Sequence, residues 1–562
     1  MKNGRVLFEV SLAVGFGVVL GATGLALTLD NKPNNYAFLD PIITIKAQLD
    51  KSYVDVPDDK VLQAGAIKGM LDSLSDPYTV YVPPADRQEF NKSLTGEYVG
   101  IGASVNTDKG WLIIVSPLED SPAFKGGLMA EDKVLEIDGK STQGLSVDDC
   151  IDLLQGTPGT TVTLLIERGS QKLTIPITRD RIKTRSVKGF HRDASDANKW
   201  EYMIDPARGI AYVRLSQFTP QVSQELSAAL SSVGASEGKL KGLVLDLRWN
   251  PGGLLNEAEN IADLFLKDGV IVSTKGRAYA DEVARARSDG TLPDFPIAII
   301  VNGQSASASE VLSGALVDND RAIVVGTRSF VKGLVQNVYQ VDNTEGGELK
   351  ITEQRYYLPS GRSIQRKDDS PEWGVDPTPG FFVPMTDDEL IELIRVRRQE
   401  DVMRADAARD AAQRWSDPEW ILGYLKDKQL AAAVKAVQLR VDGGAWKATG
   451  EEGAKSTIAG GELKRLTDAR DAIERELVRI DKRISSLENA APPVAPVDLW
   501  GDEVNVSGGK VQVYDKDGKL ITTLSLPGIA PEQSLIDAGM KPQAGTPAAA
   551  PEQPPAKPEP NK

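Results

Sequence analysis

The stretch IAIIVNGQSASASE, residues 297–310, decides how the middle of this 562-residue chain folds. Its first five residues are apolar without a break, which is typical of a strand buried on both faces of a parallel sheet. Asn302 and Gly303 favour a turn. Small residues follow, and a helix is expected to begin near Ser307 or Ser309. The stretch therefore predicts a strand, a turn and a helix in direct succession.

The same alternation extends over residues 207–380. Further apolar runs of strand length occupy residues 209–215, 242–247 and 322–325. Helical periodicity is found between the runs, at residues 222–233, 255–266 and 309–317. Strands that alternate with helices predict an α/β layer domain built on a parallel sheet.

Residues 95–180 have a different period. Short strands are expected between turns rich in Gly, Asp and Pro, at residues 98–105, 110–115, 133–137 and 161–167. One amphipathic helix is expected at residues 147–154. This pattern predicts a small, partly open β-barrel.

The N-terminal part begins with a candidate membrane segment. Lys2 and Arg5 precede an apolar stretch from Val6 to Leu29 that is long enough to span a bilayer. No clean cleavage site follows, so we expect residues 1–31 to be an uncleaved anchor, with a cleaved signal peptide as the alternative. The basic start predicts that the N-terminus lies inside and the rest of the chain outside. Residues 36–92 are predicted to be helical.

The C-terminal third has another character. Residues 387–490 are charged and helical, and apolar residues seven apart between Leu466 and Leu487 favour a short coiled coil or a helical hairpin. Self-association, adaptor binding, coverage of a functional site and a solvated appendage all stay open for this region. Residues 491–540 are expected to hold a small hairpin, and the Pro- and Ala-rich residues 541–562 are predicted to be disordered.

Composition restricts the possible chemistry. A net charge of -15 argues against nucleic acid as the main partner. The single cysteine, Cys150, excludes an intrachain disulfide, a Cys-rich zinc site and an Fe–S cluster, and we expect no metal or other cofactor. Because His191 is the only histidine, a Ser-His or Cys-His catalytic pair has little support. A serine activated by a lysine remains.

Ser305, Ser307 and Ser309 are the candidate nucleophiles. They follow a strand and begin a helix, where backbone N–H groups and the helix dipole favour a developing oxyanion. Lys332 lies among apolar residues, and burial would lower its pKa toward a neutral, basic amine. In a strand, Gln336 would face the same side as Lys332 and orient its amine.

The loop LRWNPGG, residues 247–253, follows another buried strand, and its glycines allow close approach to a carbonyl. Plain structural interpretations of each segment also stay open at this point. The serines suit a helix cap, the lysine suits a side chain that reaches out to solvent, and the glycines suit a turn.

These segments resemble the active-site signature of the carboxy-terminal processing peptidases, also called tail-specific proteases. The resemblance covers about residues 36–380 and rests on ordered motifs. These are DPYT at 76–79, GIG at 100–102, SPA at 121–123, LRWNPGG at 247–253, VNGQSASASE at 301–310, SFVKGLVQ at 329–336 and PSGRSI at 359–364. It implies a serine endopeptidase with a parallel-sheet core of the ClpP/crotonase type at residues 181–380.

The resemblance also implies roles for single residues. In this family the nucleophile precedes the lysine by 25 residues, which selects Ser307 as nucleophile and Lys332 as base. Gln336 would support the lysine, and the backbone amides of Gly252 and Ala308 would hold the oxyanion. Val331 stands where the family usually has glycine, and Ala130-Glu131-Asp132 stands where Gly-Asp is usual.

Residues 95–180 resemble a PDZ domain, which adds an extended peptide to a sheet edge and holds its carboxylate in a backbone nest. The matching loop is Gly100-Ile101-Gly102-Ala103. The expected partners are therefore proteins with exposed or unstructured C-termini, together with the membrane and a homo-oligomeric copy or an adaptor.

The expected location is the bacterial inner membrane, with a single span and the catalytic body in the periplasm or extracellular space. Two alternatives stay open. One is a catalytically inactive peptide-binding scaffold, and the other is a small-molecule acyl hydrolase on the same core.

Overall fold

A computed structural model describes most of the chain up to residue 451 and short segments beyond it. The described residues are 37–193, 196–342, 344, 346–365, 373–402, 414–451, 467, 470, 473–485, 510–514 and 519–525. The chain divides into two compact units, residues 1–461 and 462–562. The predicted anchor at residues 1–31 lies outside the described part. Within the described part, no helix is both long and apolar enough to cross a bilayer.

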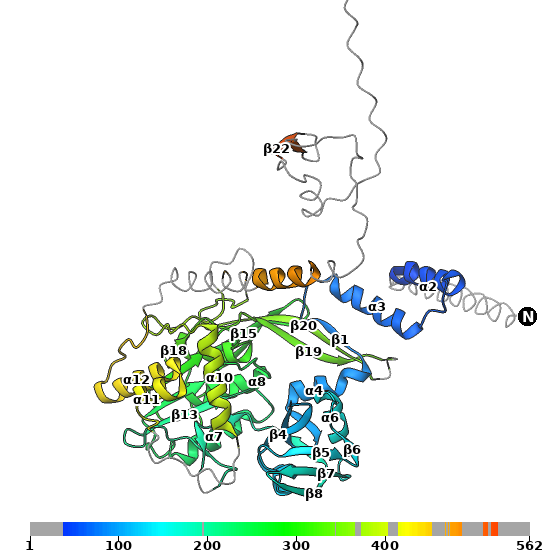
Figure 1. The fold of residues 1–562 in the computed structure, drawn as a ribbon. Coiled ribbons are helices and arrows are strands. Elements are labelled where there is room, and N and C mark those ends of the chain that lie inside the picture. The colour runs from blue at the N-terminus through cyan, green and yellow to red at the C-terminus, as the bar shows by residue number, and fades with distance from the viewer. Residues whose placement is uncertain are drawn as a thin grey trace, which may run out of the picture. The chain divides into compact units, whose positions relative to one another are not determined.

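A parallel sheet forms the centre of the first unit, as the apolar runs predict (Figure 1). Strand β13 (Ile210–Leu215) pairs with β14 (Gly242–Asp246), which pairs with β17 (Ile297–Val301) and then with β18 (Ile323–Gly326), all in parallel. A short antiparallel strand, β10 (Val187–Lys188), pairs with β13. Every residue of β14 and β17 is buried, because both faces of the sheet are covered.

Alternate strand residues enter two separate hydrophobic clusters. Val213, Leu245 and Ile299 point to one face, where helices α7 (Val222–Ser232), α8 (Leu255–Phe265) and α9 (Ala308–Asp318) supply the partners. This face contains the helix that the SASASE segment begins.

The opposite face is covered by helices from the C-terminal region. Tyr212, Val244 and Ile300 pack there against α12 (Lys428–Gly443) and α10 (Asp387–Asp401), with α11 (Pro418–Trp420) and the π-helical turn η3 (Ile421–Leu425) beside them. Residues 387–402 and 414–443 are therefore a layer of the core and not a solvated appendage.

The PDZ-like region folds around one sheet of order β3-β4-β5-β7-β8, with β6 paired to β5. Its elements are β3 (Ala103–Asp108), β4 (Trp111–Pro117), α5 (Pro122–Lys125), β5 (Lys133–Ile137), β6 (Lys140–Ser141), α6 (Val147–Leu154), β7 (Thr161–Arg168) and β8 (Gln171–Thr178). Cys150 on α6 is part of the buried core.

The single strand expected at residues 98–105 is in fact two strands. Strand β2 (Glu97–Gly100) pairs with β9 (Asp180–Lys183), whereas β3 belongs to the larger sheet. Gly102 separates them with a φ of +74°, and a Cβ atom there would lie 2.4 Å from Ser121 Cβ. Positive φ and this close contact break the strand.

A five-stranded antiparallel sheet lies beside the parallel one. It contains β1 (Val80–Val82), β15 (Val270–Gly276), β16 (Glu282–Arg285), β19 (Leu334–Gln340) and β20 (Glu348–Tyr357). The N-terminal helices η1 (Ala37–Leu39), α2 (Asp40–Ser52) and α3 (Asp59–Asp72) precede it, and η2 (Pro84–Asp86) and α4 (Arg87–Thr95) follow β1. Two short strands, β11 (His191–Arg192) and β12 (Trp200–Glu201), form a separate pair.

In the second unit, residues 473–485 are helical. The expected hairpin is present as the antiparallel pair β21 (Lys510–Tyr514) and β22 (Leu520–Ser525). Leu466, Leu487 and the tail at 541–562 lie outside the described residues.

Candidate active site

The three candidate serines have different surroundings. Ser305 is buried and donates to the carbonyl of Leu247 at 2.8 Å, and Ser309 is buried and donates to the carbonyl of Asn250 at 3.0 Å. Ser307 is half-buried and is the N-cap of α9. Ser305 and Ser309 therefore stabilise the neighbouring loop, and Ser307 is the most accessible residue of the three.

Ser307 also has an unusual backbone, with φ 55° and ψ -114°. Non-glycine residues rarely adopt such dihedrals, and they are concentrated at functional sites where the surroundings hold them in place. Gly252 packs directly against this point, since a Cβ atom on Gly252 would lie 2.8 Å from Ser307 Cβ. The predicted nucleophile and the predicted oxyanion loop are thus in contact.

Lys332 lies in the loop before β19. Burial, followed by repulsion from Lys350, lowers its pKa to about 8. Its Nζ atom lies 5.0 Å from the centre of the Tyr78 ring, and no hydrogen bond joins Nζ to the hydroxyl of Ser307. The pKa of the amine is therefore lowered in the direction that the sequence predicts, and the amine rests on an aromatic face.

Gln336 is placed differently from the expectation. Strand β19 begins at Leu334, so Lys332 is outside it, and a register shift between Val335 and Gln336 interrupts the alternation of sides. The side chain of Gln336 donates to Thr352 Oγ1 at 3.4 Å. A common strand face for Lys332 and Gln336 is not observed.

Glu310 has a role in the site that was not predicted from the sequence. It is fully buried, and its Oε2 atom accepts from the amides of Ser307 and Lys332 at 2.8 and 2.9 Å. Oε1 accepts from the amide of Val331 at 2.7 Å and from the hydroxyl of Ser329 at 2.6 Å. One carboxylate therefore joins the serine helix to the lysine loop. Its signal in the sequence was the capping-box spacing Ser307-x-x-Glu310.

Two opposing effects act on the Glu310 carboxyl. Burial raises its pKa to about 7, while the hydrogen bonds from Ser329 and the three amides act to lower it. Three of the four donors are backbone N–H groups, which cannot accept a proton in exchange. The arrangement suits the ionised carboxylate.

Two tyrosines complete the surroundings of Lys332. Tyr356 on β20 is buried, its hydroxyl donates to the carbonyl of Lys332, and it also lies in hydrogen-bonding range of the side chain of Ser307. Tyr78 comes from the DPYT segment, where Asp76 accepts from the Tyr78 amide at 3.0 Å. Segments far apart in sequence thus converge on the lysine.

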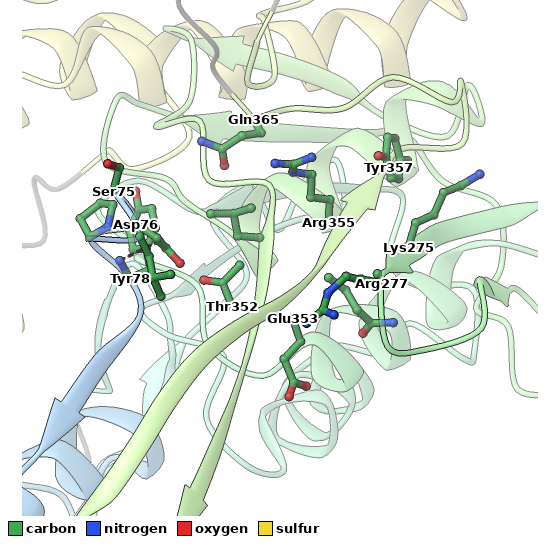
Figure 2. A pocket seen from close by; sticks show the side chains of 15 residues that line it. Ser75, Asp76, Tyr78, Lys275, Arg277, Thr352, Glu353, Arg355, Tyr357 and Gln365 are labelled. Atoms are coloured by element: carbon green, nitrogen blue, oxygen red, sulfur yellow. Dashed lines mark hydrogen bonds between the residues drawn. The ribbon is translucent and has the colours of Figure 1, made fainter. Parts of the chain in front are cut away.

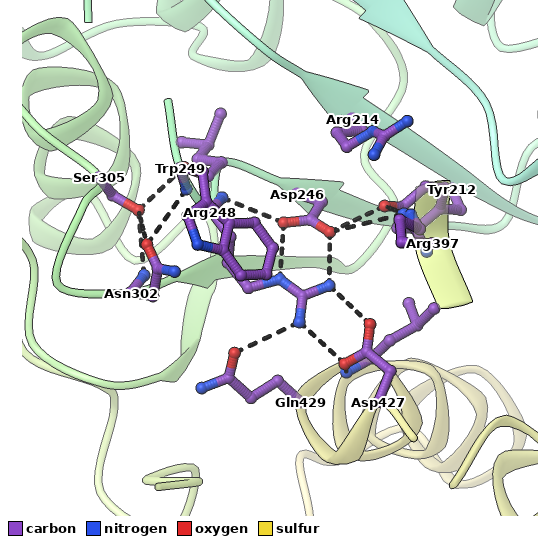
Figure 3. Close-up of polar contacts among 12 residues, drawn as sticks. Tyr212, Arg214, Asp246, Arg248, Trp249, Asn302, Ser305, Arg397, Asp427 and Gln429 are labelled. Carbon is purple, nitrogen blue, oxygen red and sulfur yellow. Dashed lines mark hydrogen bonds and ion pairs between the residues drawn. The ribbon is translucent and has the colours of Figure 1, made fainter. Parts of the chain in front are cut away.

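Buried charges hold Arg248, near the start of the loop at residues 247–253, in place (Figure 3). Arg248 donates to Asp246 at 2.7 Å and to Asp427 at 2.8 Å, and all three side chains are buried. Asp427 precedes α12, so the C-terminal layer contacts this loop directly. The Gly252 amide donates to Asn250 Oδ1 at 2.9 Å.

The candidate peptide loop of the PDZ-like region lies between β2 and β3. The carbonyls of Ile101 and Gly102 accept from Ala123 and Leu118, while Gly100 ends β2 and Ala103 begins β3. β3 is the outer strand of its sheet and pairs only with β4 among the described strands. Such an edge has free backbone groups for an added peptide strand.

A groove lies beside the lysine loop and has a volume of about 870 Å³ (Figure 2). It is lined by Tyr78, Leu334 and Gln365 near the lysine, and by residues of β15 and β20 farther away. Gln365 Oε1 accepts from the amide of Gly333 at 3.0 Å. The groove and the lysine loop therefore share a wall.

Comparison with known families agrees with this arrangement. Residues 209–379 match peptidase family S41, residues 113–168 match the PDZ domain, and residues 33–85 match the N-terminal domain of the activating protease CtpB. The PDZ match begins after the loop at residues 100–103. The S41 match ends before α10 and α12.

Individual proteins are similar to this chain over long stretches. A carboxy-terminal-processing protease of Bartonella bacilliformis is 38% identical over 418 residues, which are 72% of this chain and 91% of the relative. A probable CtpA-like serine protease of Staphylococcus haemolyticus is 35% identical over 313 residues, 55% of this chain and 59% of the relative. A solved photosystem II D1 C-terminal processing protease is 28% identical, covers 59% of this chain and 85% of its own, and has a TM-score of 0.34.

The relative from Bartonella bacilliformis aligns over nearly its whole length, and the protease and PDZ matches occur in their expected places. This chain therefore belongs to peptidase family S41, as a carboxy-terminal processing serine protease with a PDZ domain.

Proposed function

We propose that the chain is an endopeptidase that uses Ser307 as nucleophile and Lys332 as base. The observation that carries this proposal is the shared carboxylate of Glu310, which binds the amides of both residues. A lysine whose pKa is lowered to about 8 by burial is also able to accept a proton near neutral pH.

In the proposed mechanism, Ser307 Oγ attacks the scissile carbonyl while Lys332 takes its proton. The amides of Gly252 and Ala308 stabilise the oxyanion, and the protonated Lys332 then donates to the leaving amine. Water, deprotonated by Lys332, releases the acyl group from Ser307. Gln336 orients the lysine in the bound state.

Substrate binding has three tasks in this mechanism. It must bring Lys332 from the Tyr78 ring to the serine, turn Gln336 from Thr352, and share or replace the Asn250 acceptor of the Gly252 amide. Catalytic hydrogen bonds commonly tighten only when substrate is bound.

We further propose that the loop Gly100-Ile101-Gly102-Ala103 and the edge of β3 bind the C-terminus of a protein substrate. The body of the protein is proposed to work in the periplasm or extracellular space, tethered to the bacterial inner membrane by the single apolar segment at residues 1–31. The free edge of β3 supports the first part, and the apolar N-terminal sequence supports the second.

The test is degradation of a protein with an unstructured C-terminal tail by the wild type, Ser307→Ala, Lys332→Ala and a variant without residues 95–180. Both point variants are expected to lose turnover, and the deletion is expected to lose tail selectivity. Undiminished proteolysis by Ser307→Ala would rule out the assigned nucleophile.

Two further readouts separate the rival activities. A wild type that binds tails without cleaving them would be a peptide-binding scaffold. A wild type that turns over a simple ester but no peptide would be a small-molecule hydrolase.

A further inference from the structure

The groove beside Lys332 has cationic side chains that the proposed mechanism does not use. Lys275, Arg277 and Arg355 line it, and Figure 2 shows Arg355 between Tyr78 on one side and Lys275 on the other. Arg355 is directly opposite Leu334 in the pairing of β19 with β20, two residues beyond the lysine. These charges therefore line the same groove as Tyr78, whose ring contacts the amine of Lys332.

The acidic side chains in the same wall are already occupied. Asp76 accepts from the hydroxyl of Thr79 at 2.6 Å, in addition to the Tyr78 amide. Glu353 accepts from the hydroxyl of Tyr339 at 2.8 Å and from the amide side chain of Asn337. Their oxygens are thus committed to local hydrogen bonds.

The two arginines are uncommitted. No residue that the structure describes forms a hydrogen bond or an ion pair with the guanidinium of Arg277 or Arg355, whereas Lys275 pairs with Asp281 at 3.2 Å. Lys275 and Arg355 are also direct cross-strand partners in the pairing of β15 with β20. Like charges placed opposite each other destabilise a sheet, and an anionic ligand would remove that repulsion.

The net charge of the chain is -15. A net negative charge repels an acidic substrate on average, whereas exposed positive charge attracts it. Guanidinium groups bind carboxylates through two parallel hydrogen bonds, which gives them both affinity and geometric selectivity.

We propose that Arg277 and Arg355 form a subsite that binds carboxylates of the polypeptide substrate next to the scissile bond. The proposal rests on the proposed function and specifies its substrates as chains with a carboxylate near the cleavage site. That carboxylate comes either from Asp or Glu side chains or from the substrate's own C-terminus.

Quenched fluorescent peptides of one length, cleaved by the full chain, test the proposal. One set carries Glu or Gln at each position flanking the cleaved bond with an amidated C-terminus, and the other carries only neutral residues with a free or amidated C-terminus. We expect about a tenfold higher kcat/KM for peptides with the carboxylate, which diminishes as salt is added. A preference for Glu over Gln in the first set identifies a side chain as the source of the carboxylate. A preference for the free over the amidated C-terminus in the second set identifies the C-terminus as its source.

Arg277→Gln with Arg355→Gln is expected to bring the ratio of kcat/KM between charged and neutral peptides close to one. Arg355→Glu is expected to favour a peptide with Lys at the same position. Arg287→Gln is the matched control, since its side chain is 82% exposed and outside the groove, and it should keep the wild-type ratio.

An absent preference in the wild type, or one that survives the double substitution, would overturn the proposal. If the wild type cleaves no peptide, the proposed function fails instead. The subsite is then tested by fluorescence anisotropy of labelled Glu and Gln peptides with Ser307→Ala. Tighter binding of Glu that depends on both arginines supports it, and equal binding refutes it.

Discussion

Glu310→Gln tests the idea that one buried carboxylate holds the nucleophile and the base together. The substitution keeps the shape of the side chain and replaces one of its two acceptor oxygens by an NH₂ group. If the remaining oxygen faces Ser307 and Lys332, the NH₂ group faces Ser329 and Val331. The hydroxyl of Ser329 can rotate and accept, but the amide of Val331 cannot.

The magnitude follows from these contacts. One buried amide without a partner costs about 1–3 kcal/mol, and two amides that exchange a charged acceptor for a neutral one lose about 1 kcal/mol each. We expect a loss in unfolding free energy of about 3–5 kcal/mol. Val331 has a φ of 101°, a conformation that costs about 1–3 kcal/mol for a β-branched residue and is held in part by the lost hydrogen bond. The loop then relaxes and moves Lys332 away from Ser307.

The assay is peptide hydrolysis combined with urea denaturation. A displacement of about 1 Å at a catalytic group lowers the rate on the order of 100-fold, so kcat should fall by about that factor while KM changes little. Glu257→Gln is the matched control, because Glu257 is also buried and accepts from two amides, those of Gln221 and Ser223. It should lose stability and keep most of kcat.

Equal losses of kcat in the two variants would show that Glu310 acts only through general stability. A wild-type kcat in Glu310→Gln would refute the positioning role altogether.

Three further outcomes are expected. Val331→Gly should relieve about 1–3 kcal/mol of backbone strain, and the greater freedom of glycine in the unfolded chain should offset about 0.5–1 kcal/mol of this gain. The Tm in thermal unfolding should therefore rise. A lower Tm would contradict the strain at Val331. The kcat/KM should rise with pH through about 8 and then level off. The reason is that the pKa of Lys332 is lowered from 10.5 to about 8, so the base is protonated below about pH 8. A profile that is flat from pH 6 to 9 would exclude the lysine as base. Asp427→Asn should lower the free energy of unfolding in urea by about 3 kcal/mol and should lower kcat, since it leaves Arg248 buried with one carboxylate fewer. An unchanged kcat would show that the C-terminal layer does not influence the oxyanion loop.

Much of the core could be predicted because its signals are local. Uninterrupted apolar runs marked β13, β14, β17 and β18, and small residues after β17 marked the start of α9. Motif spacing selected Ser307 and Lys332 through family resemblance, and folding places Ser307 in contact with Gly252.

Non-local packing explains what was missed. The helical pattern expected at residues 387–490 includes α12, but only the folded chain shows that a sheet face receives its apolar residues and that Asp427 reaches Arg248. Likewise, Lys332 and Gln336 do not share the strand face that was expected. The register shift between Val335 and Gln336 that interrupts the alternation arises in the pairing of β19 with β20.

By itself, the sequence predicted the order of elements and, through family resemblance, the candidate reacting groups, since both depend on residue type and spacing along the chain. The tertiary structure alone decided the environment of those groups. Glu310 became a bridge because folding brings residues 307 and 332 to one carboxylate. Glu131 and Val331 replace family glycines yet both keep a positive φ, at 72° and 101°. Surrounding packing and hydrogen bonds hold the backbone there against the preference of the side chain.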